Sequence, residues 1–503
     1  MNMCISTYVL HTSVRVQHNP RSRHDHGYHE PYMVPSYRAW FTQLYLQNSL
    51  HISLAYLAIM RASFGRSMRE AHFNFASSYT PLNHGSFGAS PSRVTGYQTF
   101  LRGQTEKEPD TFIRFTYPTL LRESRRTIAP LLGVETDEVV FVPNALTAIN
   151  TVLRNLTYQN GDVILYFSTI YDSCLKTMQS LEETTNVRGY CIDLVYPVED
   201  DEICEKFLAA VLETRRQGRT TKLAMFDTVL TFPGVRFPWE RVTQICKEHD
   251  ILSCIDGAHG IGHIDLRHLN EVGPDFLITN CYKWLMVPRG CAVLYVPYRN
   301  QALIRTTYPT AEGYLPVSER ESLSPTRYFV QLFEKVSTVD TTPYVCVPEA
   351  LAFRAHVCGG EEQIREYCIR LAREGGEVMA AMMGTEVLKS KKGPLRDCCF
   401  TNVRLPLDVT EEQESAKDTG KIPAREAKAV ADWITKTSVE EFHTFIPARY
   451  YAGAFWVRIS SQIYLERSDF QWAANVLLDL CSRVKKGQHL VSVASNKGTI
   501  LTP

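Results

Sequence analysis

The chain has 503 residues, more than one ordinary hydrophobic core accommodates, which predicts at least two domains. Lys and Arg total 54 and so do Asp and Glu, so bulk charge gives no indication of a nucleic-acid or membrane partner. The 14 cysteines are scattered and no CxxC pair occurs, which argues against a zinc cluster or a disulfide framework, and we predict no metal site.

Residues 1–63 differ in composition from the rest of the chain. They are rich in His, Arg, Tyr and Ser and follow neither a helical nor a strand period. We predict a disordered or loosely packed extension there. The apolar run 50–60 is too short to span a membrane and lies too far from Met1 for a signal peptide. Cysteines inside apolar runs, such as Cys254, are typical of reduced thiols, so we expect a cytoplasmic protein.

From Phe64 onward, apolar runs alternate with helical patterns. Strands are predicted at 138–142, 162–167, 222–226, 251–255, 275–279 and 290–296. Helices are predicted between them, at 148–156, 203–215 and 239–249. Continuous apolar strands separated by helices are typical of an α/β fold with an open, mostly parallel sheet.

After Pro348 the pattern changes. Helices are predicted from 349 to about 383, a strand at 400–405, a polar stretch at 410–420, a strand at 454–460 and a final helix at 468–484. These elements predict a smaller α+β domain. We expect residues 105–345 to form the large domain, and residues 64–104 and 346–503 to form the small one.

Chemically active residues follow several of the predicted strands. Asp256 follows the strand at 251–255, Lys283 comes shortly after 275–279, and residues 143–147 lead from 138–142 into a helix. Ligands bind at the carboxyl ends of strands in open α/β sheets, so we expect these groups to lie close together.

This set of groups matches what pyridoxal 5′-phosphate (PLP) requires. A helix N-terminus holds a phosphate through its free backbone N–H groups. A lysine whose surroundings favour the neutral amine forms a Schiff base. A carboxylate keeps the pyridine nitrogen protonated, so that the ring accepts electrons.

Several motifs together resemble the class V aminotransferase superfamily, in particular its branch of isopenicillin-N-epimerase-like enzymes and ergothioneine-pathway C–S lyases. The motifs lie at 256–265, 280–290, 82–88, 109–114, 333–334, 340–344 and 456–460. The resemblance runs from about Phe64 to about Leu480. It implies the fold type I of PLP-dependent transferases, with a mostly parallel seven-stranded sheet, and a homodimer with shared active sites.

The resemblance also implies roles around the cofactor ring. Lys283 is expected to hold PLP and to move the proton at Cα. Asp256 is expected to pair with the pyridine nitrogen. His259 is expected near the ring hydroxyl, with Thr231 as a weaker candidate there, and Tyr171 is expected to stack on the ring.

Further residues are expected around the phosphate and the substrate. Cofactor contacts are expected from Asn280 and Tyr282, and from Ala145, Leu146 and Thr147 at the phosphate. Thr338 is expected to reach the phosphate in the neighbouring subunit. Arg458 is expected to bind the substrate carboxylate with a bidentate fork, and the substrate entrance is expected to be lined by Asn83, His84 and Gly85.

Five positions depart from the family pattern. Tyr282 stands where the family usually has His, and its phenol can still donate a hydrogen bond. Leu146 stands in place of a Thr, which removes one hydroxyl from the phosphate cup. Ser337 replaces the Gly before Thr338, and residues 311–313 read Ala-Glu-Gly in place of Ser-His-Gly, which leaves the substrate open.

The sequence leaves the reaction open among outcomes that share an acidic Cα–H. We favour C–S β-elimination on a cysteine conjugate or its sulfoxide, with epimerisation, transamination and cysteine desulfuration as alternatives. Desulfuration needs a reactive cysteine on a mobile loop before Arg458, and Cys398 and Cys399 lie far upstream at a predicted strand.

Two readings from other classes also remain. The changes at Tyr282 and Leu146 permit a catalytically inactive dimeric scaffold with the same fold. A nicotinamide enzyme is less favoured, because residues 257–262 lack the G-x-G-x-x-G spacing that opens a helix.

Overall fold

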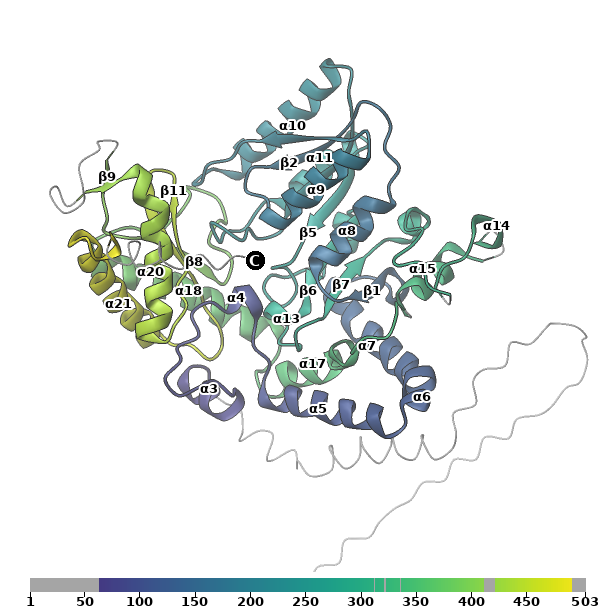
Figure 1. Ribbon diagram of the computed structural model, residues 1–503, viewed down its shortest axis with the longest axis horizontal. Coiled ribbons are helices and arrows are strands. Elements are labelled where there is room, and N and C mark those ends of the chain that lie inside the picture. Colours follow the sequence, from purple (N-terminus) through teal and green to yellow (C-terminus); the bar gives the residue numbers. More distant parts are fainter. Residues whose placement is uncertain (1–62, 312, 321–322, 335, 411–420, 491–503) are drawn as a thin grey trace, which may run out of the picture. The chain divides into compact units, whose positions relative to one another are not determined.

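Seven strands form a central sheet in the order β1-β7-β6-β5-β4-β2-β3 (Figure 1). The computed structural model describes residues 63–311, 313–320, 323–334, 336–410 and 421–490. β7 runs antiparallel to both of its neighbours, and all other pairs are parallel. The strands are β1 (Val139–Val142), β2 (Asp162–Phe167), β3 (Arg188–Ile192), β4 (Thr220–Asp227), β5 (Leu252–Asp256), β6 (Phe276–Asn280) and β7 (Ala292–Tyr295). The expected mostly parallel seven-stranded α/β sheet is confirmed.

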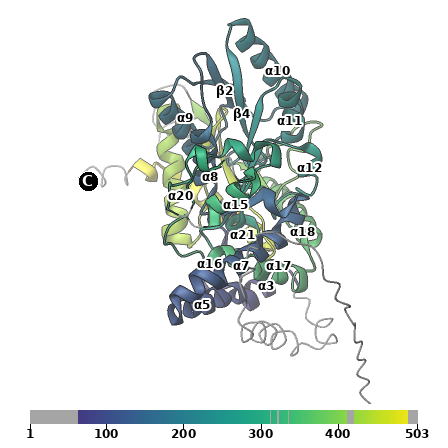
Figure 2. The same ribbon diagram turned by 90° about the vertical axis from the view of Figure 1, so that its right-hand side faces the viewer.

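Helices cover both faces of the sheet because successive strand residues point to opposite sides. Ile164, Met225 and Cys254 lie in one apolar core with α8 (Ala145–Asn155), α9 (Asp172–Thr184) and α15 (Pro325–Glu334). Their neighbours Leu165, Phe226 and Ile255 lie in a second core with α7 (Tyr117–Leu132), α10 (Asp200–Arg216) and α11 (Trp239–Glu248). Figure 2 shows α9 and α11 on opposite sides of β2 and β4.

One strand of the sheet has no counterpart among the strands located from the sequence. β3 (Arg188–Ile192) is the edge strand, and only Ile192 in it is buried. An edge strand has one neighbour and solvent beside it, so it needs no continuous apolar run. The six strands located from the sequence are present, with their ends shifted by up to two residues.

The segment before the sheet is helical. It contains α3 (Arg66–His72), α4 (His84–Phe87), α5 (Ser92–Lys107), α6 (Pro109–Thr111) and the π-helical turn η1 (Phe112–Thr116). Shorter elements follow within and after the sheet region: η2 (Thr136–Glu138), α12 (Leu269–Val272), α13 (Cys281–Trp284), η3 (Tyr298–Leu303), α14 (Val317–Arg320) and α16 (Thr342–Val345).

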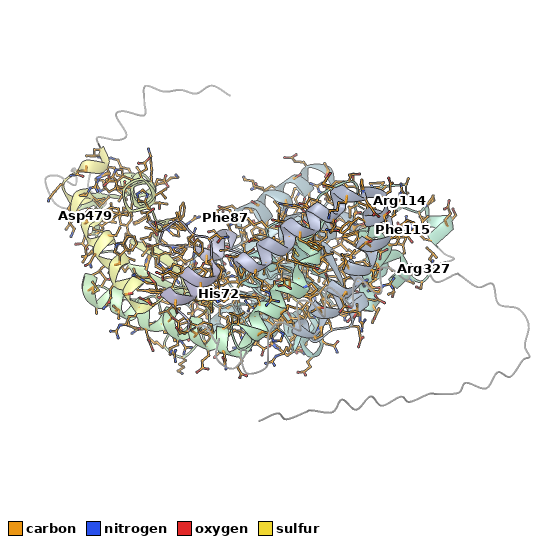
Figure 3. All side chains as sticks on the ribbon, turned by 90° about the horizontal axis from the view of Figure 1, so that it is seen from below. His72, Phe87, Arg114, Phe115, Arg327 and Asp479 are labelled. Carbon is orange, nitrogen blue, oxygen red and sulfur yellow. The ribbon has the colours of Figure 1, made fainter. Side chains whose placement is uncertain are left out.

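The C-terminal region builds a second, three-stranded antiparallel sheet in the order β11-β12-β8. Its elements are α17 (Val347–His356), α18 (Glu361–Met383), β8 (Phe400–Arg404), α20 (Ala427–Phe442), β11 (Ala448–Tyr451), β12 (Ala454–Ser460) and α21 (Arg467–Lys485). β9 (Val409–Thr410) and β10 (Ile422–Pro423) form a short parallel pair, followed by η4 (Ala424–Glu426). Seen from below, Asp479 of α21 lies at one end of the molecule and Phe115 and Arg327 at the other (Figure 3).

Two sequence predictions fall outside the described part of the chain. These are the extension over residues 1–62 and most of the polar stretch at 410–420. Among the described helices, none combines the length and the apolar character that a bilayer crossing requires.

Candidate active site

Lys283 lies in α13, directly after β6, at the carboxyl edge of the large sheet. Its Nζ is 3.2 Å from Nε2 of His259. Burial lowers the pKa of Lys283 to about 8, and the carboxyl of Asp256 opposes this shift. At pH 7 the site therefore keeps close to a tenth of this amine neutral and nucleophilic, far more than for an ordinary lysine.

Asp256 is the last residue of β5 and is buried. Its Oδ1 accepts a hydrogen bond from the backbone N–H of Ala258 (2.9 Å), and Oδ2 is 3.5 Å from the thiol of Cys174. A second buried carboxyl, that of Asp227, stands at the end of β4, in register with Asp256. Burial, followed by the charge of Asp256, raises the pKa of Asp227 well above its usual range. Two carboxyls thus stand near Lys283 at adjacent strand ends.

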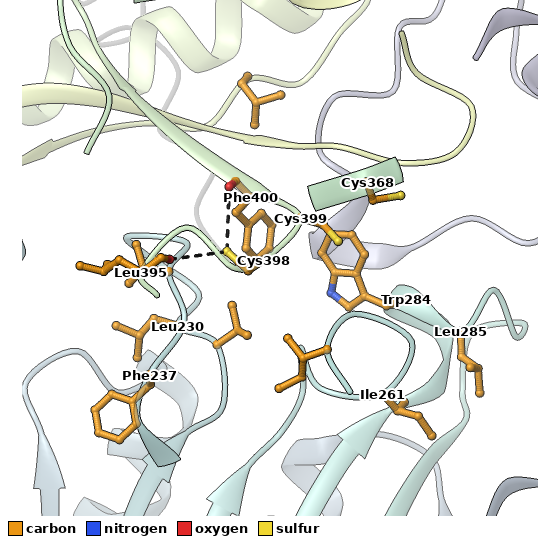
Figure 4. Packing of buried hydrophobic residues seen from close by; sticks show 14 of the residues in the cluster. Leu230, Phe237, Ile261, Trp284, Leu285, Cys368, Leu395, Cys398, Cys399 and Phe400 are labelled. Carbon is orange, nitrogen blue, oxygen red and sulfur yellow. Dashed lines mark hydrogen bonds between the residues drawn. The ribbon is translucent and has the colours of Figure 1, made fainter. Parts of the chain in front are cut away.

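His259 is held by neighbours on two sides. Its Nδ1 accepts a hydrogen bond from the indole N–H of Trp284 (3.1 Å), which leaves Nε2 facing Lys283 and Thr231 (3.5 Å). Burial lowers the pKa of His259 well below its usual value, so the ring is neutral. Trp284 packs edge-on against Phe400 of β8 (5.2 Å between centroids), and Figure 4 shows the two rings side by side. The structure brings together Lys283, Asp256, His259 and Thr231, as expected from the sequence.

The N-terminus of α8 lies at the same edge of the sheet. Asn144 caps the helix by accepting a hydrogen bond from the N–H of Thr147 (2.9 Å). Oδ1 of Asn280, at the end of β6, accepts from the N–H of Ala145 (2.9 Å). Asn280 therefore fastens the start of α8 to β6. Leu146 lies between these two bonded positions and is partly exposed.

Arg458 comes from β12 in the small sheet and is 4% exposed. Its guanidinium donates to the carbonyl of Thr231 (2.6 Å), to Oδ1 of Asn83 (2.7 Å) and to Oγ of Ser86 (3.2 Å). It also lies 4.6 Å from the centre of the Phe400 ring. Its Nε is buried and has no hydrogen-bond partner among the described residues. Burial lowers the pKa of Arg458 to about 10.

The motif at 82–88 lies between Arg458 and Lys283. Asn83 meets Arg458, whereas His84 is buried, with Nδ1 2.6 Å from the hydroxyl of Tyr464 and its ring 5.1 Å from that of Trp284. Gly85 lies so close to Phe400 that a Cβ there would be 2.5 Å from the ring. The structure therefore places His84 and Gly85 in packing contacts behind the site, and their predicted contact with substrate stays a prediction.

Tyr171 and Tyr282 lie near each other, and Thr338 lies in a cavity beside α8. Tyr171 precedes α9 and is 44% exposed. Tyr282 is partly buried, which raises the pKa of its phenol, with the phenol of Tyr171 contributing. Thr338 lines a cavity of about 1030 Å³ together with Leu146 and Thr147 of the same chain. Its predicted role toward a neighbouring subunit stays a prediction.

Some residues at the site have no signal in the sequence. Phe400 contacts Arg458, but an aromatic residue in a strand is typical of any core. Trp284 and Ser86 lie within the motifs 280–290 and 82–88, and nothing in the sequence predicts their contacts with His259 and Arg458. Asp227 does have a signal, because it follows a predicted strand in the same way as Asp256. Among the described residues, no group of three or more His, Cys, Asp or Glu side chains is arranged to hold a metal ion.

The chain matches known proteins over most of its length. The family profile described as Aminotransferase class-V matches residues 113–403. The chain is 35% identical to the L-cysteine desulfhydrase-like protein lolT1 of Epichloe uncinata, over 84% of this chain and 97% of that one. It is 31% identical to the hercynylcysteine sulfoxide lyase of Schizosaccharomyces pombe, over 83% and 98%.

The chain belongs to the class-V aminotransferase family. A solved cystine C–S lyase, C-DES, shares the fold with a TM-score of 0.62 at 16% identity, covering 80% of this chain and 97% of that one. The family and the site together make this a PLP-dependent enzyme of fold type I, as expected from the sequence.

The groups present at the site of this family member fit PLP. Lys283 offers an amine with a lowered pKa, Asp256 a buried carboxyl, and α8 a helix N-terminus at the same sheet edge. The N–H groups of Ala145 and Thr147 already donate to side chains. A phosphate would therefore be held more by the helix dipole and by side chains around the N-terminus of α8 than by these two N–H groups.

The thiols before Arg458 do not suit a persulfide mechanism. Cys398 and Cys399 are both buried beside Phe400 (Figure 4). Burial raises the pKa of Cys398 to about 11 and raises that of Cys399 well above its usual value. A nucleophilic cysteine needs exposure and a lowered pKa, and neither is present here.

Proposed function

We propose that this enzyme is a PLP-dependent C–S lyase that cleaves L-cysteine or a cysteine S-conjugate by β-elimination. The observation that carries the proposal is the state of Arg458. Among the described residues, this buried cation donates hydrogen bonds to neutral oxygen acceptors alone, and its Nε has no hydrogen-bond partner. A buried charge needs a counter-charge, and a substrate carboxylate supplies one in bidentate form.

Arg458 lies close enough to Lys283 for its charge to lower the pKa of that amine. An amino acid held by its carboxylate at Arg458 therefore presents its amino group and Cα toward Lys283. Relatives named L-cysteine desulfhydrase-like protein and hercynylcysteine sulfoxide lyase support sulfur as the leaving atom.

PLP, when bound, withdraws electrons from Cα and makes its proton acidic. Lys283 then accepts that proton at Nζ. Because Nδ1 of neutral His259 accepts from Trp284, its Nε2–H is a donor, and it orients the lone pair of the neutral Lys283 amine across 3.2 Å before the transfer. The Cβ–S bond breaks and its electron pair leaves with sulfur, which takes up a proton. Water completes the reaction, so that a cysteine conjugate yields a thiol, pyruvate and ammonium.

We also propose two domains: a large one formed by residues 105–345 and a small one formed by residues 64–104 together with 346–503. The large sheet lies within 139–295 and the small sheet within 400–460, which supports this division.

We propose further that the enzyme is a homodimer with shared active sites. The cavity beside the N-terminus of α8 is lined by apolar Ile113, Leu146 and Val339, all of them exposed. Phe87 and Phe115 are also exposed (Figure 3). A second subunit burying this surface would bring Thr338 near the other site.

The test is a visible absorbance spectrum of the purified enzyme with PLP, followed by assay of pyruvate with cysteine and its S-conjugates. Wild type should show a Schiff-base band and release pyruvate. Lys283→Ala should lose both, while Lys428→Ala on the exposed face of α20 should keep both. A band that shifts with substrate but never yields pyruvate would favour epimerisation or transamination. No band with PLP would favour the inactive scaffold.

A further inference from the structure

A second arginine shares a sheet face with Arg458. β11 and β12 are antiparallel, and Arg449 stands opposite Trp456 while Arg458 stands opposite Asn402 of β8. Side chains of opposed residues lie on the same face, and alternate residues along one strand share it. Arg449, Trp456, Arg458 and Asn402 therefore all project from one face of the small sheet.

That face packs against the loop that carries Thr231. Asn402 exchanges two hydrogen bonds with the backbone of Gly234 (3.0 and 2.8 Å), and Arg458 donates to the carbonyl of Thr231. Thr231 in turn reaches His259. The guanidinium of Arg449 lies 5.5 Å from the ring centre of Phe232, the next residue in this loop. Arg449 therefore contacts the residue next to Thr231, which itself lies at the active site.

Arg449 carries an unneutralised charge there. Its side chain is exposed, and no acidic side chain among the described residues forms an ion pair with it. Arg404 stands opposite Trp456 on the other flank and provides a contrast, since it pairs with Glu386 at 2.9 Å. Of the two arginines beside Trp456, only Arg449 is therefore available to an external anion.

Two further observations indicate a ligand at this position. The charge of Arg449 acts on Arg458, where it adds to the effect of burial in lowering the pKa of that guanidinium. Two cations facing one region without an acid between them repel each other unless anions bind there. The indole Nε1 of Trp456, beside Arg449, is buried and has no hydrogen-bond partner among the described residues. The indole N–H of Trp456 and the guanidinium of Arg449 thus lie next to each other, away from Arg458, where the α-carboxylate of the substrate is proposed to bind.

We propose that Arg449 binds an anionic group on the sulfur substituent of the substrate, and that the preferred substrates are cysteine S-conjugates whose substituent ends in a carboxylate. The inference rests on the proposed lyase function and narrows its substrate class. Arg458 holds the α-carboxylate, and Arg449 holds the distal one across the Thr231–Phe232 loop. The ring of Phe232 supports the guanidinium while leaving its N–H edge free for a bidentate contact.

The test compares two conjugates of equal size, S-(2-carboxyethyl)-L-cysteine and its neutral amide S-(2-carbamoylethyl)-L-cysteine. Each is given to wild type, Arg449→Gln and the control Arg404→Gln. Pyruvate release gives kcat/KM, and the shift of the visible band gives the dissociation constant. Wild type and Arg404→Gln should favour the carboxylate by about tenfold or more, as expected for one charge-assisted contact. Arg449→Gln should lose that preference and handle the amide as wild type does.

Each other outcome has a defined meaning. Equal use of both conjugates by wild type, or equal loss of both in Arg449→Gln, would overturn the inference. A change in sedimentation of Arg449→Gln would also overturn it, because Arg449 would then pair across a subunit interface. If no variant releases pyruvate, the lyase function fails. The dissociation constants still decide whether Arg449 selects the distal carboxylate.

Discussion

The pH dependence of cofactor capture should report the pKa of Lys283. Only the neutral amine attacks the aldehyde of PLP. With a pKa of about 8, close to a tenth of the Lys283 side chains are neutral at pH 7. An ordinary lysine, with a pKa of 10.5, would have about 300-fold less neutral amine at that pH. The capture rate of cofactor-free protein should therefore rise with pH and level off above about pH 8.

Two variants should shift the midpoint, the pH at which the capture rate is half of its maximum, in opposite directions. The carboxyl of Asp256 raises the pKa of Lys283 and the guanidinium of Arg458 lowers it, both against the larger effect of burial. Asp256→Asn should therefore shift the midpoint below that of wild type, and Arg458→Gln should shift it above. Asp256→Asn keeps the size of the side chain, so burial of the amine changes little. Gln is shorter than Arg, and water entering beside the amine would raise its pKa in the same direction as the lost charge.

Stopped-flow absorbance after mixing cofactor-free protein with PLP measures the capture rate at each pH. N-acetyl-lysine with PLP in the same buffers gives the reference for an amine in water and for titration of PLP itself. A protein rate that follows the reference up to pH 10 would refute a buried, depressed lysine. Shifts of the same sign in Asp256→Asn and Arg458→Gln would refute the electrostatic account.

Three further outcomes are expected. Gly88→Ala should destabilise the fold and impair cofactor capture, because at a φ of +64° the new Cβ would lie 1.7 Å from the backbone carbonyl oxygen of Tyr282. Gly103→Ala, on an open helix surface, is the control, and equal melting temperatures of the two variants would contradict this expectation. Burial lowers the pKa of His84 and His263 to about 3, so below pH 6.5 the unfolded chain binds more protons than the folded one. Urea unfolding should show the free energy of unfolding falling by roughly 1.4 kcal/mol per histidine for each pH unit below 6.5, and His→Gln variants should reduce that slope. Arg458→Lys should raise KM for cysteine conjugates about tenfold or more through loss of the bidentate contact, and an unchanged KM would place the carboxylate elsewhere.

The large sheet could be predicted because its central strands are buried on both faces and read as continuous apolar runs. The edge strand Arg188–Ile192 was not predicted, because most of its side chains are partly or fully exposed and it has no continuous apolar run. The helices predicted from 349 to about 383 are present as α17 and α18, and the break between them, from His356 to Glu361, was not located from the sequence. Gly359 and Gly360 between them adopt positive φ. Two consecutive glycines were the available signal for that break.

At the site, the sequence indicates the residues that follow strands and misses those brought in by long-range pairing. Asp256 and Lys283 come from neighbouring strands of one sheet, where topology alone predicts proximity. Phe400 reaches the site because β8 pairs with β12 in a register that sets it opposite Ser460, and that register depends on packing between segments about sixty residues apart. The same pairing places Asn402 beside Arg458.

The position of the thiols bears on where the sulfur goes after the Cβ–S bond breaks. A desulfurase passes sulfur to a cysteine that is exposed and partly ionised. Of the cysteines in the described ranges, only Cys191 is exposed, and it lies on the edge strand β3, where burial raises the pKa of its thiol. Cys398 is fully buried among carbonyl oxygens of its own loop and of Gly234. With no suitable acceptor among these thiols, sulfur leaves together with its substituent. Elimination is therefore the outcome that this site favours over persulfide transfer.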